Sequence, residues 1–189
     1  MAKSKGICVY ATFALCLLLF FFFFFAFLKK MVRQATADDY DFIRSLYFHP
    51  LTNPFLLYEM SDAPDFAAIF DDLQAKGLLY IFETEGIPRG MFKLIPLNYR
   101  TSHIAYLGGV AIHPDYFGAG FGSQMLLEII QLGKDRGFRR IELSVAHINE
   151  KAIRLYEKTG FQKEGVLRDY CWLKSENRYM DEVMMAYLL

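Results

Sequence analysis

The chain has 189 residues, which is enough for one ordinary domain with a substantial hydrophobic core. Its 21 basic and 21 acidic side chains balance, but four lysines and no acid lie in the first thirty residues, so residues 31–189 hold 17 basic and 21 acidic side chains. Residues 31–189 therefore carry a net negative charge, and such a domain is a poor source of the clustered Lys and Arg that phosphate contacts need. The balance excludes a general nucleic-acid-binding protein and suits a cationic amine substrate slightly better.

The three cysteines give no sign of a disulfide scaffold or a metal site. Cys8 and Cys16 lie in an apolar N-terminal run, and Cys171 stands alone in the rest of the chain. There is no CxxC pair, and no spacing of Cys and His resembles a metal site, so no metal is expected. The default setting for the domain is therefore the reducing cytoplasm.

Residues 7–28 form a run of 22 residues without a charge. As a helix, this run would be about 33 Å long, close to the thickness of the hydrocarbon core of a bilayer. One interpretation is a single membrane-spanning anchor in residues 1–30, with basic residues on both sides that leave its orientation open. The other is that residues 1–30 are translated upstream sequence, because Met31 begins a segment that looks like the natural start of a domain covering residues 31–189.

Hydrophobic periodicity predicts the order of elements in residues 31–189. A strand, two helices separated by a proline-rich loop, and three strands come first, with a turn at 84–90 between the first two of these strands. A helix, a strand, a helix with Asn149 as N-cap and two strands follow. The expected strands are 32–36, 78–83, 91–97, 102–113, 139–148, 161–173 and 177–189, and the expected helices are 36–48, 65–77, 119–136 and 149–160. This order predicts an α/β (α+β) fold with a mixed sheet that is antiparallel in its first half, and it excludes doubly wound dinucleotide-binding and all-β folds.

The stretch "HPDYFGAGFGSQMLLEII", residues 113–130, places Gly118, Gly120 and Gly122 at alternate positions between a strand and a helix. The spacing matches neither the dinucleotide fingerprint nor a Walker A loop. Glycines still let the backbone turn tightly, and the free N–H groups at the start of the helix point toward any anion, of which a pyrophosphate is the obvious one. A tight corner without a ligand is the alternative for the glycines taken alone.

Two motifs resemble those of the GNAT superfamily of acyl-CoA-dependent N-acetyltransferases, over residues 103–165 and more loosely over 31–189. The first is Q/R-x-x-G-x-G/A at the start of a helix, which here is "FGAGFG", with Phe117 where the family has Gln or Arg. The second is N-x-x-A-x-x-L-Y-x-x-x-G-F, which "NEKAIRLYEKTGF" matches in register. The C-terminal segment looks most like the subgroup of ribosomal-protein N-terminal, spermidine and phosphinothricin acetyltransferases.

The resemblance implies a largely antiparallel central sheet flanked by helices, with acetyl-CoA bound as co-substrate where two parallel strands splay apart. The backbone of the first strand would hold the pantetheine arm through Val110, Ala111 and Ile112. The glycine turn would hold the pyrophosphate through the N–H groups of Gly118, Ala119, Gly120, Phe121, Gly122 and Ser123. Asn149 would cap its helix and touch the coenzyme. Tyr156 matches the general acid of the family, which protonates the departing thiolate, and its alternative role is a core tyrosine.

The general base is not specified by the motifs. The candidates are Glu142, His113, His147 and Glu59, and a chain of water molecules is the alternative. The resemblance implies a direct attack of the amine on the thioester, and Cys171, which has no sequence-local sign of being a nucleophile, agrees with this.

The leading hypothesis is an acetyl-CoA-dependent N-acetyltransferase that acts on a primary amine, either a small molecule or a peptide N-terminus. Two alternatives are a catalytically idle acyl-CoA-binding module tethered to the membrane through residues 7–28, and a scaffold whose main feature is that run. A homodimer is a further partner arrangement left open. Residues 47–60 and 97–103 are expected to line the acceptor site, since loops over a fixed scaffold carry specificity.

Overall fold

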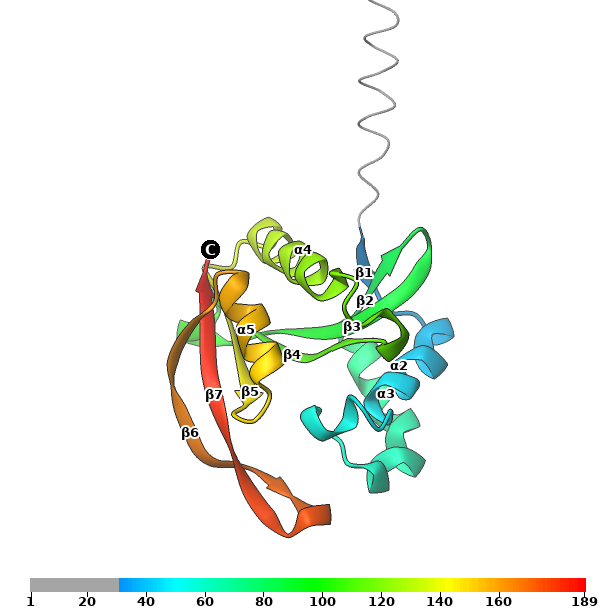
Figure 1. Cartoon of the computed structure of the whole chain (residues 1–189). Helices are drawn as coiled ribbons and strands as arrows, with labels where there is room; N and C mark the ends of the chain where they lie inside the picture. Colours follow the sequence, from blue (N-terminus) through cyan, green and yellow to red (C-terminus); the bar gives the residue numbers. More distant parts are fainter. Residues whose placement is uncertain (1–30) are drawn as a thin grey trace, which may run out of the picture. The chain divides into compact units, whose positions relative to one another are not determined.

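The computed structural model describes residues 31–189, which form one seven-stranded sheet covered by helices (Figure 1). Residues 1–30, and with them the predicted membrane anchor, lie outside the described residues. Within residues 31–189, no helix combines the length and apolar character that crossing a membrane requires. The main elements are β1 (Val32–Gln34), α2 (Tyr40–Tyr47), α3 (Phe66–Ala75), β2 (Leu79–Thr84), β3 (Ile87–Pro96), β4 (Ile104–Ile112), α4 (Phe121–Asp135), β5 (Arg140–Ala146), α5 (Glu150–Lys158), β6 (Gln162–Leu173) and β7 (Arg178–Leu188).

The sheet is mixed, with the strand order β1-β2-β3-β4-β5-β7-β6. Strands β1 to β4 pair antiparallel, as do β5 with β7 and β7 with β6. Strands β4 and β5 are parallel, and α4 supplies the crossover that a parallel pair needs. The predicted order of elements and the largely antiparallel mixed sheet are confirmed.

Alternate residues of the strands face two separate cores. On one face, which we call the α4/α5 face, the helices α4 and α5 pack on Phe92 of β3 and on Ile141, Leu143 and Val145 of β5. On the opposite α2/α3 face, α2 and α3 pack on residues such as Met91 of β3. Figure 1 shows α4 and the pair α2 and α3 on opposite sides of β3 and β4. A ligand between β4 and β5 can therefore be approached from two different sides.

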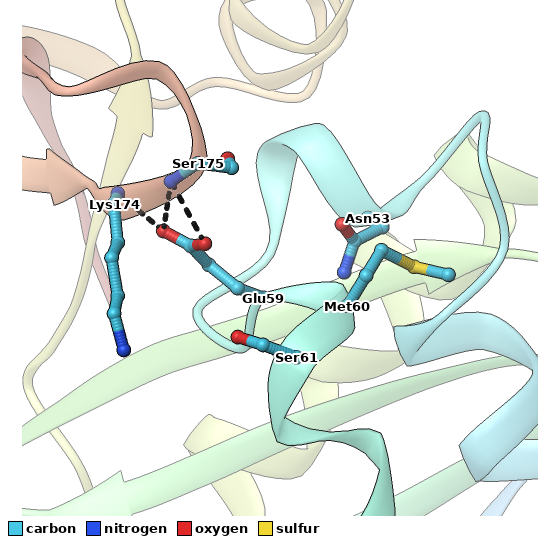
Figure 2. A pocket seen from close by; sticks show the side chains of 6 residues that line it. All are labelled: Asn53, Glu59, Met60, Ser61, Lys174 and Ser175. Atoms are coloured by element: carbon cyan, nitrogen blue, oxygen red, sulfur yellow. Dashed lines mark hydrogen bonds between the residues drawn. The ribbon is translucent and has the colours of Figure 1, made fainter.

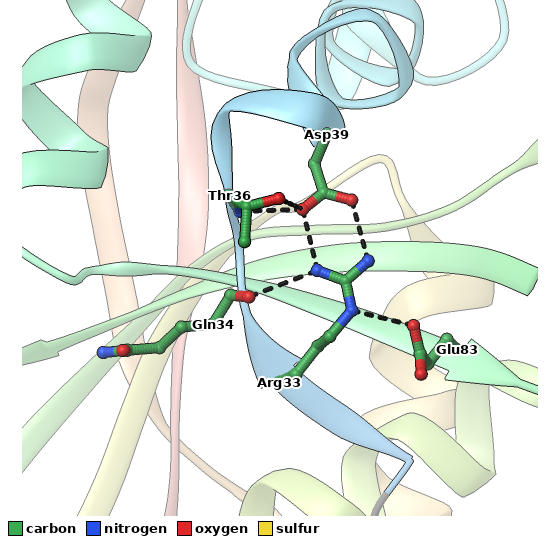
Figure 3. Close-up of polar contacts among 5 residues, drawn as sticks. All are labelled: Arg33, Gln34, Thr36, Asp39 and Glu83. Carbon is green, nitrogen blue, oxygen red and sulfur yellow. Dashed lines mark hydrogen bonds and ion pairs between the residues drawn. The ribbon is translucent and has the colours of Figure 1, made fainter. Parts of the chain in front are cut away.

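Arg33 of β1 ties the first strand to β2 and to the start of α2 (Figure 3). Its guanidinium donates to both carboxylate oxygens of Asp39, at 2.7 and 2.8 Å, and to Glu83 of β2 at 2.8 Å. Asp39 also accepts from the backbone N–H and the hydroxyl of Thr36, in a capping box. Burial alone would raise the pKa of Asp39, but the hydrogen bonds from Arg33 and Thr36 outweigh it and hold that pKa below its usual value. The short first strand is thus held by charge as well as by strand pairing.

The hairpin between β2 and β3 is tighter than expected. The predicted turn at 84–90 is too long, because β3 already begins at Ile87 and the turn consists of Glu85 and Gly86. Both have positive φ, 55° and 79°, as in two-residue hairpin turns whose twist matches that of the strands. Pro88 is tolerated in β3 because pairing with β4 begins at Gly90.

Candidate functional site

Strands β4 and β5 pair over three rungs and then separate. The rungs join Ile104 to Arg140, Ala105 to Ile141 and Tyr106 to Glu142. β4 continues to Ile112 and β5 to Ala146, and their outer edges stay paired with β3 and β7. The inner edges of both strands therefore have no strand partner beyond Tyr106 and Glu142, and their backbone N–H and C=O groups can bind a ligand there. We call this region the β4/β5 opening.

The opened part of β4 contains the three residues predicted to hold the pantetheine arm, Val110, Ala111 and Ile112. Where this part begins, Gly109 and Val110 of β4 both face Phe92 of β3, which makes a β-bulge. Gly109 has a φ of +60°, and a Cβ added to it would lie 2.6 Å from the Tyr47 hydroxyl. Both the backbone conformation and the lack of space require glycine at this position.

The glycine turn between β4 and α4 presents open backbone. Gly118 and Gly120 have φ of +78° and +84°, and a Cβ at either would meet no atom within 4 Å. Gly120 is the N-cap of α4 and makes no side-chain cap, so the N–H groups of residues 121–123 are left for a ligand or water. Gly122 has another role, because a Cβ there would lie 2.9 Å from Leu155 of α5. The turn fits a bound anion, with glycine needed for its conformation at two positions, while at the third it lets the end of the Leu155 side chain pack closely.

Two further residues predicted to touch the coenzyme, Asn149 and Ala119, already make hydrogen-bond contacts within the protein. Asn149 caps α5 as predicted, and its Oδ1 accepts from the N–H of Ala152 at 3.2 Å. The N–H of Ala119 points to the carbonyl of Tyr116 across a long distance of 3.5 Å. A coenzyme contact from Asn149 would therefore come from its Nδ2 donor, beside the cap that its oxygen makes.

Arg89 places a cation beside the glycine turn, a feature that sequence reasoning missed. Its guanidinium carbon lies 4.1 Å from the ring centroid of Tyr116 and 5.3 Å from that of Phe121, and its Nε donates to Thr84 at 3.0 Å. Phe117, which replaces the polar residue of the motif, is 54% exposed. A charged donor thus lies close to the position where the motif has lost one.

Tyr156 is a core residue whose hydroxyl is not among the fully buried, unpartnered ones. The residue is 7% exposed, and its ring lies 5.8 Å from that of Phe161. Within residues 31–189, the fully buried hydroxyls without a hydrogen-bond partner are those of Tyr47 and Tyr80, and the Tyr156 hydroxyl is not one of them. Burial raises the pKa of Tyr156, and the nearby Tyr106 adds a smaller effect in the same direction. The phenol therefore keeps its proton throughout the ordinary pH range. Its burial and its proposed acid role are compatible.

The α2/α3 face of the opening carries polar groups that sequence reasoning did not identify. The Tyr106 hydroxyl and the Ser144 Oγ lie 2.8 Å apart and join β4 to β5 just where the strands separate. Lys93 of β3 is 6% exposed, and its Nζ lies 5.4 Å from the ring centroid of Tyr58. Burial lowers the pKa of the Lys93 amine. The sequence held one sign of this burial. Lys93 stands two residues after Met91 in a central strand, and residues i and i+2 of a strand share one face.

All four candidate bases are engaged by their neighbours. Glu142 accepts from the Nε of Arg140 at 2.8 Å. His147 has its Nδ1 3.1 Å from the carbonyl of Asp181. His113 has its Nδ1 3.4 Å from the backbone N–H of the residue two positions on. None of these contacts singles out one residue as the proton acceptor.

Glu59, the fourth candidate, ties the loop between α2 and α3 to the turn between β6 and β7 (Figure 2). Its carboxylate accepts from the backbone N–H groups of Lys174 and Ser175. The pocket drawn in Figure 2 has a volume of about 360 Å³, and a second one of about 540 Å³ lies between α5 and the strands β6 and β7. Neither pocket is lined by β4 or the glycine turn, so both are separate from the β4/β5 opening.

Residues 97–103 do not lie at the opening, which corrects the expectation that they line the acceptor site. They connect β3 to β4 just before Ile104, where the first rung to β5 forms, and the N–H of Arg139 donates to the carbonyl of His103. The opening lies toward the other end of β4. In contrast, the other loop expected at the acceptor site, residues 47–60, supplies Tyr58 to the α2/α3 face.

Cys171 is not poised as a nucleophile. Its Sγ donates to Glu182 at 3.1 Å, and burial, with this carboxylate, raises the pKa of the thiol to about 12. Within residues 31–189, no group of three or more His, Cys, Asp or Glu side chains is arranged to hold a metal ion.

Comparisons with known proteins agree on one family. The sequence model of a family described as "Acetyltransferase (GNAT) family" matches residues 40–161. The uncharacterized N-acetyltransferase p20 of Bacillus licheniformis is 31% identical over 137 residues, which cover 69% of this chain and 74% of that protein. The [ribosomal protein bS18]-alanine N-acetyltransferase of Haemophilus influenzae is 36% identical over 84 residues, 44% of this chain and 57% of that protein. Across four curated relatives, the matched segment spans between 35% and 74% of the relative's length.

Solved structures agree in fold. The spermidine N-acetyltransferase of Vibrio cholerae, in complex with CoA and spermine, superimposes with a TM-score of 0.72 at 23% identity, covering 83% of this chain and 94% of that one. Other structural neighbours were solved with acetyl-CoA.

Proposed function

The chain belongs to the GNAT family of N-acetyltransferases, and from this membership we propose that it transfers the acetyl group of acetyl-CoA to a primary amine. The observation that carries the proposal is the combination of a β4/β5 opening, paired over three rungs, with an uncapped glycine turn that begins α4. The first offers unpaired backbone to an extended arm, and the second offers N–H groups to a pyrophosphate.

Acetyl-CoA would supply the acetyl group as an activated thioester. Its pantetheine arm would lie along the backbone of β4, and its pyrophosphate would bind the N–H groups of the glycine turn. The residues assigned to these contacts are Val110, Ala111, Ile112, Gly118, Ala119, Gly120, Phe121, Gly122, Ser123 and Asn149. Arg89 is a further candidate, because its guanidinium is held against Tyr116 and Phe121 beside this turn.

Tyr156 is the proposed general acid. The amine acceptor attacks the thioester carbonyl directly, and the Tyr156 hydroxyl donates its proton to the departing thiolate. Burial raises its pKa, so the hydroxyl is protonated at neutral pH. The proton of the incoming ammonium leaves through water or through one of the candidate bases, none of which is favoured by its contacts.

The acceptor is a small-molecule amine or a protein N-terminus. Both classes occur among the relatives, since one is named for ribosomal-protein alanine and one structure holds spermine. The cytoplasmic setting, the membrane attachment through residues 7–28 and the homodimer stay predictions.

A catalytically idle acyl-CoA-binding module is the second candidate. It is favoured by the exposed, apolar Phe117 and by the engagement of all four candidate bases with neighbouring groups. The two candidates are separated by incubating the full chain with acetyl-CoA and a panel of primary amines and measuring thiol release and product mass. Acetyl-CoA binding without any product would favour the idle module.

A further inference from the structure

Lys93 is a buried cation without an acidic partner. It is 6% exposed, and within residues 31–189 its Nζ takes part in no ion pair or hydrogen bond. The face of the Tyr58 ring at 5.4 Å offsets part of this burial, but it leaves the N–H donors of the ammonium without an acceptor. A buried charge in this state is costly unless a ligand completes it.

The Lys93 Nζ is nevertheless not fully enclosed by the protein. Within residues 31–189, two side-chain polar atoms are fully buried and have no hydrogen-bond partner, and these are the hydroxyls of Tyr47 and Tyr80. The Lys93 nitrogen is not one of them. Because this nitrogen also lacks a partner, part of the residual exposed surface of Lys93 belongs to the nitrogen itself. The stem of the side chain is packed, and its charged tip keeps a small exposed surface.

The position of Lys93 points to the acceptor side of the proposed reaction. Its Cε lies 3.2 Å from the place where a Cβ on Gly109 would be, and 3.6 Å from the corresponding place on Gly108. The side chain therefore crosses the bulge of β4 one residue before Val110, on the α2/α3 face. The glycine turn leads into α4, which packs on the opposite face, so Lys93 does not lie on the side assigned to the coenzyme phosphates.

We propose that Lys93 is a carboxylate-binding subsite for the acceptor, and that the acceptor amine therefore carries a carboxyl group. The subsite rests on the proposed acetyltransferase function. The contacts around Lys93 come from glycines and tyrosines and include no second cation, which matches a ligand group with a single negative charge. A polyamine such as spermine has no negative group that would pair with Lys93. A second cation beside the buried Lys93 ammonium would also be disfavoured, because like charges repel.

The experiment uses the full chain and amines matched in pairs. Amino acids, ω-amino acids and dipeptides are each assayed beside their own carboxamide, which keeps size and amine but removes the negative charge. The wild type should favour the carboxylate member of the accepted pairs by roughly ten- to hundredfold in kcat/KM, the worth of a hydrogen bond to a charged group. Lys93→Met should abolish this preference by raising KM for the carboxylate, with the carboxamide unaffected.

Lys76→Met is the matched control, because Lys76 lies on the surface and pairs with Asp72. It should keep the wild-type preference. Equal turnover of both members of each pair by the wild type would overturn the subsite while leaving the acetyltransferase function intact. A Lys93→Met variant that lowers kcat equally for both members, with a changed pH profile, would show that Lys93 acts as a base instead. If acetyl-CoA binds and no amine is acetylated, the proposed function itself fails, and the subsite fails with it.

Discussion

The guanidinium of Arg89 on β3 stacks on the ring of Tyr116, with its central carbon 4.1 Å from the ring centroid. Tyr116 directly precedes the apolar Phe117 in the sequence. Arg89→Met should therefore raise the KM for acetyl-CoA by about tenfold, since a charged donor next to the proposed pyrophosphate site is lost. The matched control is Arg154→Met, because Arg154 is exposed on α5 and pairs with Glu150 one turn away. An unchanged KM in Arg89→Met would remove Arg89 from the coenzyme site.

Tyr156→Phe should lower the rate of acetyl transfer by about a hundredfold or more, while acetyl-CoA still binds, because the proposed acid for the departing thiolate is lost. Tyr80→Phe is the control, since it removes a fully buried tyrosine hydroxyl that has no hydrogen-bond partner and lies outside the proposed site. Rates and coenzyme affinity are measured separately. The assignment of Tyr156 is wrong if both variants transfer acetyl at the wild-type rate.

The conformation of the glycine turn can be separated from general stability by two substitutions. Gly120→Ala and Gly137→Ala both place a side chain at a positive φ, +84° and +77°, and in both cases a Cβ would meet nothing within 4 Å. Each should lower the free energy of unfolding by about 1–2 kcal/mol. Gly120→Ala should in addition raise the KM for acetyl-CoA, because Gly120 shapes the turn and Gly137 follows the far end of α4. Equal effects on KM in the two variants would contradict a coenzyme role for the turn.

Asp39 should make the stability of the domain depend on pH in acid. Its pKa is lower in the folded chain than in the unfolded one, so its contribution is present above the usual carboxyl range and is lost as the pH falls through the folded pKa. Asp39→Asn should lower the unfolding free energy at neutral pH by about 1–2 kcal/mol and should flatten its decline in acid, as measured by denaturant titration.

Asp72→Asn is the control for Asp39, because the Asp72 pair with Lys76 is largely exposed and contributes little. A stability curve of Asp39→Asn that runs parallel to the wild-type curve down to low pH would show that the Arg33 network does not carry this effect.

The order of elements could be predicted from the sequence because periodicity changes sharply between helices and strands. Asn149 could be predicted as a helix cap because capping is a local contact. Its side-chain oxygen accepts from the N–H of a residue only three positions on. The start of β3 was missed because a two-residue turn depends on the φ of Glu85 and Gly86, which composition does not specify. Local chemistry was thus predicted well, and backbone conformation less well.

The polar side chains around the opening depend on contacts between distant segments. The Nζ of Lys93 lies over the ring of Tyr58, which is 35 positions earlier in the chain, and no local sequence pattern predicts such a contact. Arg89 is held by Tyr116 and Phe121 in the same way, across the β3–β4 pair. In contrast, the glycine turn and the Tyr156 motif are contiguous in sequence, so both could be matched to motifs of the family, and this resemblance implied their place in the candidate site.

The most direct test of the proposed function is a thiol-release assay with the full chain, acetyl-CoA and a panel of primary amines, followed by mass spectrometry of the acceptor. The expected result is one CoA thiol released for each acetylated amine, with strongly reduced release by Tyr156→Phe. Binding of acetyl-CoA with no acetylated product from any amine or peptide would contradict an acetyltransferase and leave an idle coenzyme-binding module.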